Sequence, residues 1–123
     1  MEQQPVNANP CTIQLRQVDA LVIFDLAGEI DAFADETLDA GYAAAITRQP
    51  RCLLLNFSRV DYINSTGIAL IVAILAQTRR DHLTLLACCL NEHYQEMFRI
   101  TRLSDFIAVF ANEESALQEA HAC

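Results

Sequence analysis

The feature of this sequence that most limits its fold is an unbroken apolar segment directly after a short polar cluster. Nine apolar residues run from position 68 to 76, behind Asn64 and Ser65. Together with the polar residues at its two ends, the segment covers positions 65–80, which is too long for a typical strand but ordinary for a helix. Asn64 or Ser65 can cap its start, and two arginines suit the dipole at its end. We therefore predict a helix over residues 65–80.

This helix is apolar on nearly all sides, unlike a surface helix, which has one apolar stripe and one polar face. Two interpretations follow. Either the sheet covers one face and neighbouring helices cover the other, or part of the helix stays open as a docking patch for another protein. Periodicity alone favours the first interpretation, because covered apolar residues are the more common case.

Length and composition indicate one globular domain. The chain has 123 residues, of which 53% are hydrophobic and 20% are charged, so it can bury a core and is neither disordered nor fibrous. We expect a flexible N-terminal segment over residues 1–10 and a single domain over residues 11–123. The polar start has no targeting signal, and no apolar run is long enough to cross a bilayer. We therefore expect a soluble, cytoplasmic protein without direct membrane insertion.

The charge balance limits the possible partners. Sixteen acidic residues against eight basic ones give a formal net charge of −8. Nucleic-acid binding draws its affinity largely from Lys and Arg, so we expect no nucleic-acid partner. An acidic surface instead favours solubility or a basic protein partner.

The cysteines predict neither a zinc site nor a disulfide framework. Their number, five, is odd, and no C-x-x-C spacing occurs among positions 11, 52, 88, 89 and 123. Because Cys52 and Cys88 fall within apolar strands, where a thiol behaves as a small hydrophobe, we expect the cysteines to be reduced core residues.

The remaining pattern alternates strands with helices. Apolar or alternating segments predict strands at residues 11–18, 20–26, 52–56, 83–88 and 106–110. Capping residues predict helices over residues 31–47, 92–101 and 112–120, begun by Asp31, Asn91 and Asn112. We expect inward-facing side chains in the first two helices at Phe33, Leu38, Tyr42, Ile46, Tyr94, Met97, Phe98 and Ile100. The predicted fold is α/β, a single mixed sheet of four to five strands with helices packed on it.

This topology also predicts where a site lies. The strands at 52–56 and 83–88 flank the apolar helix, so they form a β-α-β unit and should be parallel neighbours. Sites in such folds usually lie at the C-terminal edge of the parallel strands, and Ser65 follows the first of these strands.

Few residues offer recognisable catalytic or ligand-binding chemistry. His82, His93 and His121 stand apart, and no partner lies at metal-ligand spacing, so we expect no metal site. Neither a G-x-S-x-G elbow nor a glycine-rich nucleotide motif is present. We expect no cofactor and no enzymatic activity. Ser65 remains, and it is either a capping serine or a phosphoacceptor; residue type alone favours the cap.

Two short motifs resemble those of the STAS domain family, specifically the stand-alone bacterial anti-sigma factor antagonists. One is Gly28-Glu29-Ile30-Asp31 after the second strand, and the other is Asn64-Ser65-Thr66-Gly67-Ile68 at the start of the apolar helix. An apolar strand separates them, and a pattern of Leu and Phe follows around positions 98–110. The resemblance covers about residues 11–120, and its strength lies in the order of the motifs rather than in either motif alone.

The resemblance implies a phosphorylation switch. In that family an anti-sigma factor that is also a serine/threonine kinase phosphorylates the first hydroxyl residue of the second motif, which here is Ser65. The unphosphorylated antagonist binds this kinase and frees the sigma factor, and a serine phosphatase restores the unmodified form. Phosphorylation of Ser65 is therefore expected to weaken binding. The expected partner-binding residues are Asp31, Ile63, Asn64, Thr66, Gly67 and Ile68. Asn64 stands where the family usually has aspartate, so it keeps the capping ability and lacks the charge.

Two alternatives to this function remain at the level of the sequence. Similar domains act as phosphorylation-independent interaction modules in stressosome-like or lipid-transport assemblies. A small enzyme with Ser65 as nucleophile is the other alternative, and the sequence offers it no evident base.

Overall fold

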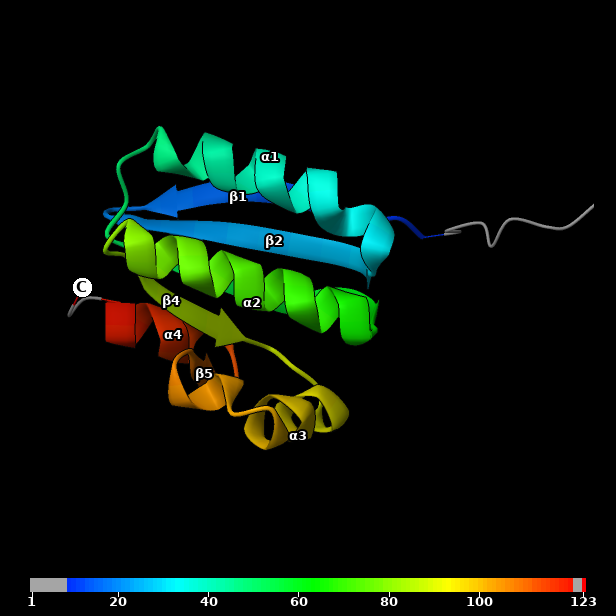
Figure 1. Cartoon of the computed structure of the whole chain (residues 1–123). Helices are drawn as coiled ribbons and strands as arrows, with labels where there is room; N and C mark the ends of the chain where they lie inside the picture. Colours follow the sequence, from blue (N-terminus) through cyan, green and yellow to red (C-terminus); the bar gives the residue numbers. More distant parts are fainter. Residues whose placement is uncertain (1–8, 121–122) are drawn as a thin grey trace, which may run out of the picture.

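The computed structural model describes residues 9–120 and residue 123. Its centre is one five-stranded sheet with helices packed against it (Figure 1). The strands are β1 Thr12–Val18, β2 Leu21–Ile30, β3 Cys52–Ile63, β4 Thr84–Cys88 and β5 Ala108–Phe110. The helices are α1 Asp35–Ile46, α2 Ser65–Arg80, α3 Glu92–Ile100 and α4 Glu113–Ala120, with short 3-10 turns η1 Ala32–Ala34 and η2 Leu103–Asp105.

The sheet is mixed, and its strands lie in sequence order. β1 is antiparallel to β2, whereas β2, β3, β4 and β5 run parallel to one another. β3, α2 and β4 form the predicted β-α-β unit, in which Leu54 pairs with Leu86. The structure therefore confirms the predicted α/β fold with a mixed sheet, and it confirms the predicted limits of α2.

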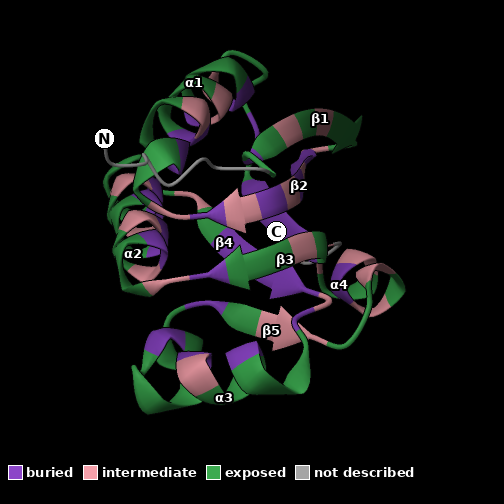
Figure 2. Cartoon of the chain, turned by 90° about the vertical axis from the view of Figure 1, so that its right-hand side faces the viewer, coloured by how far each residue is buried: buried purple, intermediate pink, exposed green. Residues whose placement is uncertain are grey.

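Helices cover both faces of the sheet and enclose two cores. Figures 1 and 2 show α1 and α2 on one face and α4 on the other. The larger core lies beneath α1, α2 and α3 and contains Phe24, Leu55 and Phe98, while the smaller core lies beneath α4 and contains Ile23 and Leu54. Alternate residues of a strand point to opposite faces, so the continuous apolar runs of β2 and β3 supply both cores. No helix of the described residues is long and apolar enough to cross a membrane.

β2 and β3 are longer than the sequence predicted. β2 continues to Ile30 and β3 to Ile63. β3 pairs with β4 only as far as Asn56, and beyond this residue β2 is its one neighbour among the described residues. Two irregularities each add one residue to β3 opposite β2, the second between Val60 and Tyr62. This part of β3 is largely exposed and polar, which is why its sequence indicated a loop.

Some predicted inward positions face solvent. Leu38 and Tyr42 are buried as predicted, but Phe33 is 65% exposed. Phe33 lies in the 3-10 turn η1, which precedes α1 and is wound more tightly than an α-helix. The direction of its side chain therefore does not follow the spacing of α1, and Phe33 does not lie on the buried face of that helix. Ile46 is only half-buried, and Ile100, at the last position of α3, is 66% exposed.

The apolar helix α2 is covered on one side only. Its buried face consists of Gly67, Ile71, Ile74 and Thr78. Its outer face is formed by small and apolar exposed residues: Ala69, Val72, Ala73 and Ala76. The expectation that neighbouring helices would cover the outer face was therefore wrong, because α1 and α3 lie beside α2 and not over it (Figure 2).

The cysteines include one disulfide that the sequence analysis did not predict. Cys52, at the start of β3, is bonded to Cys123, and their Cα atoms are 6.2 Å apart. This corrects the expectation that the cysteines are reduced. The two residues are 71 positions apart in the sequence, and the fold brings them together. The other three cysteines are free thiols, of which Cys11 and Cys88 are buried.

Candidate functional site

The C-terminal ends of β2 and β3 lie side by side and place the two sequence motifs together. Ile30 pairs with Ile63 at the last position of both strands. Asp31 follows the first strand, and Asn64 and Ser65 follow the second, so the edge predicted from the topology holds both motifs. The turn η1 also packs against α2, which closes this corner of the molecule.

The sequence left open whether Asn64 or Ser65 caps α2, and in the structure the cap is Asn64. Its side-chain Oδ1 accepts a hydrogen bond from the Gly67 N–H at 2.8 Å. Its backbone carbonyl accepts from the Ile68 N–H at 2.9 Å, and its own N–H donates to the Ile30 carbonyl at 3.3 Å. An N-cap residue of this kind satisfies donors that the first helical turn leaves without partners. The Ser65 hydroxyl takes no part in these capping bonds.

Gly67 allows α2 to begin directly against the end of β2. A Cβ atom at this position would lie 2.0 Å from the Ile30 carbonyl oxygen and 3.0 Å from Ile63 Cγ2. Any side chain would therefore push the first turn of α2 away from the sheet. Gly67 and Ile63 are both buried, and their contribution to this corner is to fix the position of the turn.

Ser65 and Thr66 occupy the first two positions of α2, and both are exposed. Ile68, which the sequence placed among the partner-binding residues, is half-buried and packs against the larger core. From Ser65, the exposed outer face of α2 continues through Ala69 and Val72. A hydroxyl group is thus presented at one end of an open apolar helix face.

Asp31 lies across the corner from α2 and is half-buried. Its Oδ1 accepts a hydrogen bond from the Phe33 N–H at 3.0 Å, so it caps η1 rather than the long helix that the sequence predicted. Its charge also reaches Cys11: burial, with a further contribution from Asp31, raises the pKa of the Cys11 thiol to about 11. A cysteine with such a pKa stays protonated and is a poor nucleophile at neutral pH.

Three exposed apolar side chains near this corner were not among the predicted site residues. Phe33 in η1 is 65% exposed, Tyr62 near the end of β3 is 49% exposed and Val72 on α2 is 44% exposed. Single exposed apolar side chains are common on any protein surface, but several around one site can anchor a partner. For Tyr62, the sequence did contain a signal. It is an isolated aromatic residue in a polar stretch, where no alternating pattern of buried residues accounts for it.

The corner is acidic. Residues 28–36 and 60–70 include Glu29, Asp31, Asp35, Glu36 and Asp61, and they contain no Lys or Arg. Asp61 accepts a hydrogen bond from the Asn9 side chain, which brings the first described residue to the same edge. An added negative charge at Ser65 would therefore meet the N-terminus of α2 and no nearby cation from these segments.

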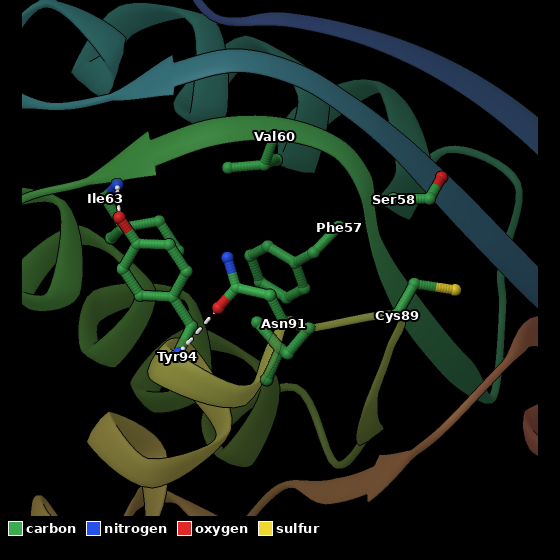
Figure 3. Close-up of a pocket in the computed structure, with 8 residues that line it drawn as sticks. Phe57, Ser58, Val60, Ile63, Cys89, Asn91 and Tyr94 are labelled. Carbon is green, nitrogen blue, oxygen red and sulfur yellow. Dashed lines mark hydrogen bonds between the residues drawn. The ribbon is translucent and has the colours of Figure 1, made fainter.

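A small pocket lies next to this corner, beside the part of β3 that extends beyond its pairing with β4 (Figure 3). Its volume is about 190 Å³, and its walls include Phe57, Val60 and Asn91. At one end the buried Tyr94 ring of α3 reaches β3, where its hydroxyl accepts a hydrogen bond from the Ile63 N–H at 3.0 Å. Tyr94 thereby fixes the end of β3 two residues before Ser65.

Among the described residues, no three His, Cys, Asp or Glu side chains form a group that could hold a metal ion. The chemistry of this corner is therefore that of an exposed hydroxyl, an acidic surround and an apolar helix face.

Comparison with known proteins places this fold in a family. The family model of the STAS domain matches residues 12–116, which is most of the chain. The chain therefore belongs to the STAS domain family, and its sheet and helices match those of solved structures of that fold.

Three similar proteins are described either as anti-sigma factor antagonists or as a cell fate determinant. BtrV of Bordetella bronchiseptica, a candidate anti-sigma factor antagonist, is 30% identical over 110 residues, which cover 88% of this chain and 92% of BtrV. An anti-sigma factor antagonist from Mycobacterium paratuberculosis has a structure with a TM-score of 0.80 at 17% identity, covering 93% of this chain and 97% of its own. The Bacillus cell fate determinant SpoIIAA, solved in a phosphorylated form, gives a TM-score of 0.68 at 23% identity, covering 88% and 98% of the two chains.

Proposed function

We propose that this protein is an anti-sigma factor antagonist that works as a phosphorylation-switched binding module. In its unmodified form it binds an anti-sigma factor that is also a serine/threonine kinase. Phosphorylation of Ser65 weakens this binding, and a serine phosphatase restores it. Membership of the STAS family and the similarity to BtrV support the class of function.

We choose Ser65 as the phosphoacceptor because Asn64, and not Ser65, caps the start of α2. A serine at the start of a helix is most often a cap. Here Asn64 accepts the capping bond from Gly67, at 2.8 Å. The exposed Ser65 hydroxyl is therefore not needed to hold the helix, and modifying it leaves the cap in place.

The position also tolerates a phosphate. A phosphoserine adds about −1.5 to −2 charges and three strong acceptor oxygens. At the first position of α2 these oxygens face the positive end of the helix dipole and the N–H groups of Ser65 and Thr66, which precede the first capped donor. The fold should therefore survive modification.

The partner is what loses contacts. The apolar residues Phe33, Tyr62 and Val72 offer anchors around Ser65 for an apolar contact surface on the kinase. A dianion at Ser65 would have to be desolvated against that apolar surface, which weakens binding. Asp31, Asn64, Thr66 and the exposed edge of Ile68 belong to the proposed contact surface, while the buried Ile63 and Gly67 support it from beneath.

Phosphorylation is tested by intact-mass measurement after incubation with ATP and the anti-sigma kinase of the same organism. We expect one added phosphoryl group on the unmodified sequence and on Thr66→Ala, and none on Ser65→Ala. If Ser65→Ala gains the group and Thr66→Ala does not, the acceptor is Thr66. If no variant gains it with any candidate kinase, a phosphorylation-independent interaction module is the better explanation.

The contact surface is tested separately by substitutions on exposed residues. Val72→Glu and Phe33→Ala should each weaken kinase binding at least about tenfold without lowering the melting temperature by more than a few degrees. Ile100→Ala is the matched control, because Ile100 is as exposed as Phe33 but lies at the far end of α3. If all three variants bind the kinase as tightly as the unmodified protein does, the interface lies elsewhere.

A further inference from the structure

The smaller core depends on a single short helix. α4 has eight residues, and only Ala116 among them is fully buried, whereas Leu117 and Ala120 are partly buried. A helix of this length is unstable in water without tertiary support. Its attachment to the sheet therefore decides whether the core beneath it, which includes Leu21 and Leu54, stays covered.

The two ends of α4 are attached by different chemistry. At its start, Glu113 accepts hydrogen bonds from Arg16 at 2.5 Å and from Asn56 at 2.9 Å, which tie it to β1 and β3. Beyond its end, the Cys123 N–H donates to the Ala120 carbonyl at 3.0 Å, and the disulfide joins Cys123 to Cys52.

The packing around the second attachment is thin. A pocket of about 300 Å³ separates the end of α4 from the turn between β1 and β2, and its walls include Leu21, Leu117, Ala120 and Cys123. Side chains thus leave space beside the disulfide, and the covalent bond joins this end of the chain to β3. Cys52 is fully buried, but Cys123 is half-buried, so a reductant can reach the disulfide from the Cys123 side.

We propose that the Cys52–Cys123 disulfide is a reversible redox latch for α4. In the reducing step, one thiolate of a dithiol reductant attacks the Cys123 sulfur, the bond to Cys52 breaks, and Cys52 leaves as a thiolate that takes up a proton. The second thiol of the reductant then displaces Cys123, so the reductant gains a disulfide and the protein gains two thiols. The reverse exchange with a disulfide oxidant closes the latch.

Opening the latch releases the C-terminal end of α4 while the Glu113 contacts hold its start. The apolar surface at Leu21 and Leu117 then becomes accessible on the face opposite α2 (Figure 2). The latch acts on a different face from Ser65, so it stands independently of the phosphorylation proposed above.

The test combines thiol counting with melting and hydrogen exchange on the full chain. After treatment with oxidised glutathione and its removal, the intact mass should be about 2 Da below that of the fully reduced protein, with Cys52 and Cys123 joined in one peptide. Dithiothreitol should then lower the melting temperature by at least about 5 °C and speed amide exchange in residues 113–120. Cys123→Ser should melt like the reduced protein under both conditions, and Cys89→Ser should keep the full response.

Three results would overturn the proposal. The first is five free thiols after oxidation, and the second is a disulfide between two molecules instead of within one. The third is an intramolecular Cys52–Cys123 bond whose reduction changes neither the melting temperature nor the exchange of α4. If Cys123→Ser melts well below the reduced unmodified protein, the variant has a folding defect of its own, separate from the loss of the disulfide.

Discussion

At the scale of single residues, the first turn of α2 depends on Asn64. Its side chain holds the Gly67 N–H at 2.8 Å, and its backbone joins the turn to Ile30. Asn64→Ala should lower the free energy of unfolding by about 1 kcal/mol, because one capping bond is lost. Asn64→Asp should keep most of this stability, because a carboxylate caps equally well. Denaturant unfolding of the three proteins measures the difference, and equal loss in both variants would show that the side chain does not act as a cap.

Gly67 is the second residue on which this corner depends. Gly67→Ala should destabilise the protein by about 1–3 kcal/mol, because the new Cβ would overlap the Ile30 carbonyl, a backbone atom that cannot move alone. Gly41→Ala in α1 is the matched control. There the new Cβ meets the tip of the Ile13 side chain at 2.8 Å, which can rotate, and alanine favours the helix. Thermal melting should show a clear loss for the first variant and a small change for the second. Similar losses in both would contradict the close approach of α2 to β2.

At the scale of elements, the attachment of α4 should make stability depend on pH. Hydrogen bonds from Arg16, and to a smaller extent from Asn56, hold the pKa of the Glu113 carboxyl below its ordinary value of 4.5. The folded protein therefore favours the charged carboxylate, and this stabilisation is present above pH 4.5 and is lost as the pH falls through the lowered pKa.

Melting curves between neutral and acidic pH test this attachment. The unmodified protein should be more stable than Glu113→Gln near neutral pH. The difference in stability should narrow as the pH falls below about 4.5, where the unfolded state takes up a proton first, and it should be lost below the lowered pKa of the folded state, where the carboxyl carries a proton in both states. Glu114→Gln, at the exposed next position, should follow the unmodified protein throughout. A gap that stays constant with pH would show that the charge of Glu113 does not contribute.

The elements also show what the sequence predicts and what it leaves out. The limits of α2 and the cap at Asn91 follow from local patterns, because length, apolar content and capping chemistry are visible in a few neighbouring residues. The extension of β3 to Ile63 was missed because that part is largely exposed and extends beyond the pairing with β4. Long-range contacts leave no local signal, so neither the Cys52–Cys123 bond nor the contact of Tyr94 with Ile63 was predicted.

The sequence also predicted part of the candidate site. The topology predicted that Ser65 follows a parallel strand at the C-terminal edge of the sheet. The family resemblance supplied Asp31, whereas the parallel pairing of β2 with β3 that brings Asp31 to the same edge was not predicted. The exposure of Phe33 depends on the 3-10 turn, which changes the phase between the end of β2 and α1. The choice of Asn64 over Ser65 as the cap depends on side-chain geometry that residue types alone do not distinguish.

At the scale of the whole molecule, the structure separates two regions on opposite sides of the sheet. The proposed switch at Ser65 lies at the edge where α2 begins, and the proposed latch lies beneath α4 (Figure 2). We expect the N-terminus of α2 to accommodate the phosphate at Ser65, so that the phosphate acts on the partner and the fold itself changes little.

The decisive comparison is between unmodified and Ser65-phosphorylated protein in calorimetric titration against the anti-sigma kinase, with melting temperatures recorded on the same samples. We predict that phosphorylation weakens binding by at least about tenfold, or about 1.4 kcal/mol, while the melting temperature shifts by only a few degrees. Equal affinity of the two forms would contradict the switch. Loss of binding together with a large drop in melting temperature would show that the phosphate acts by unfolding the domain.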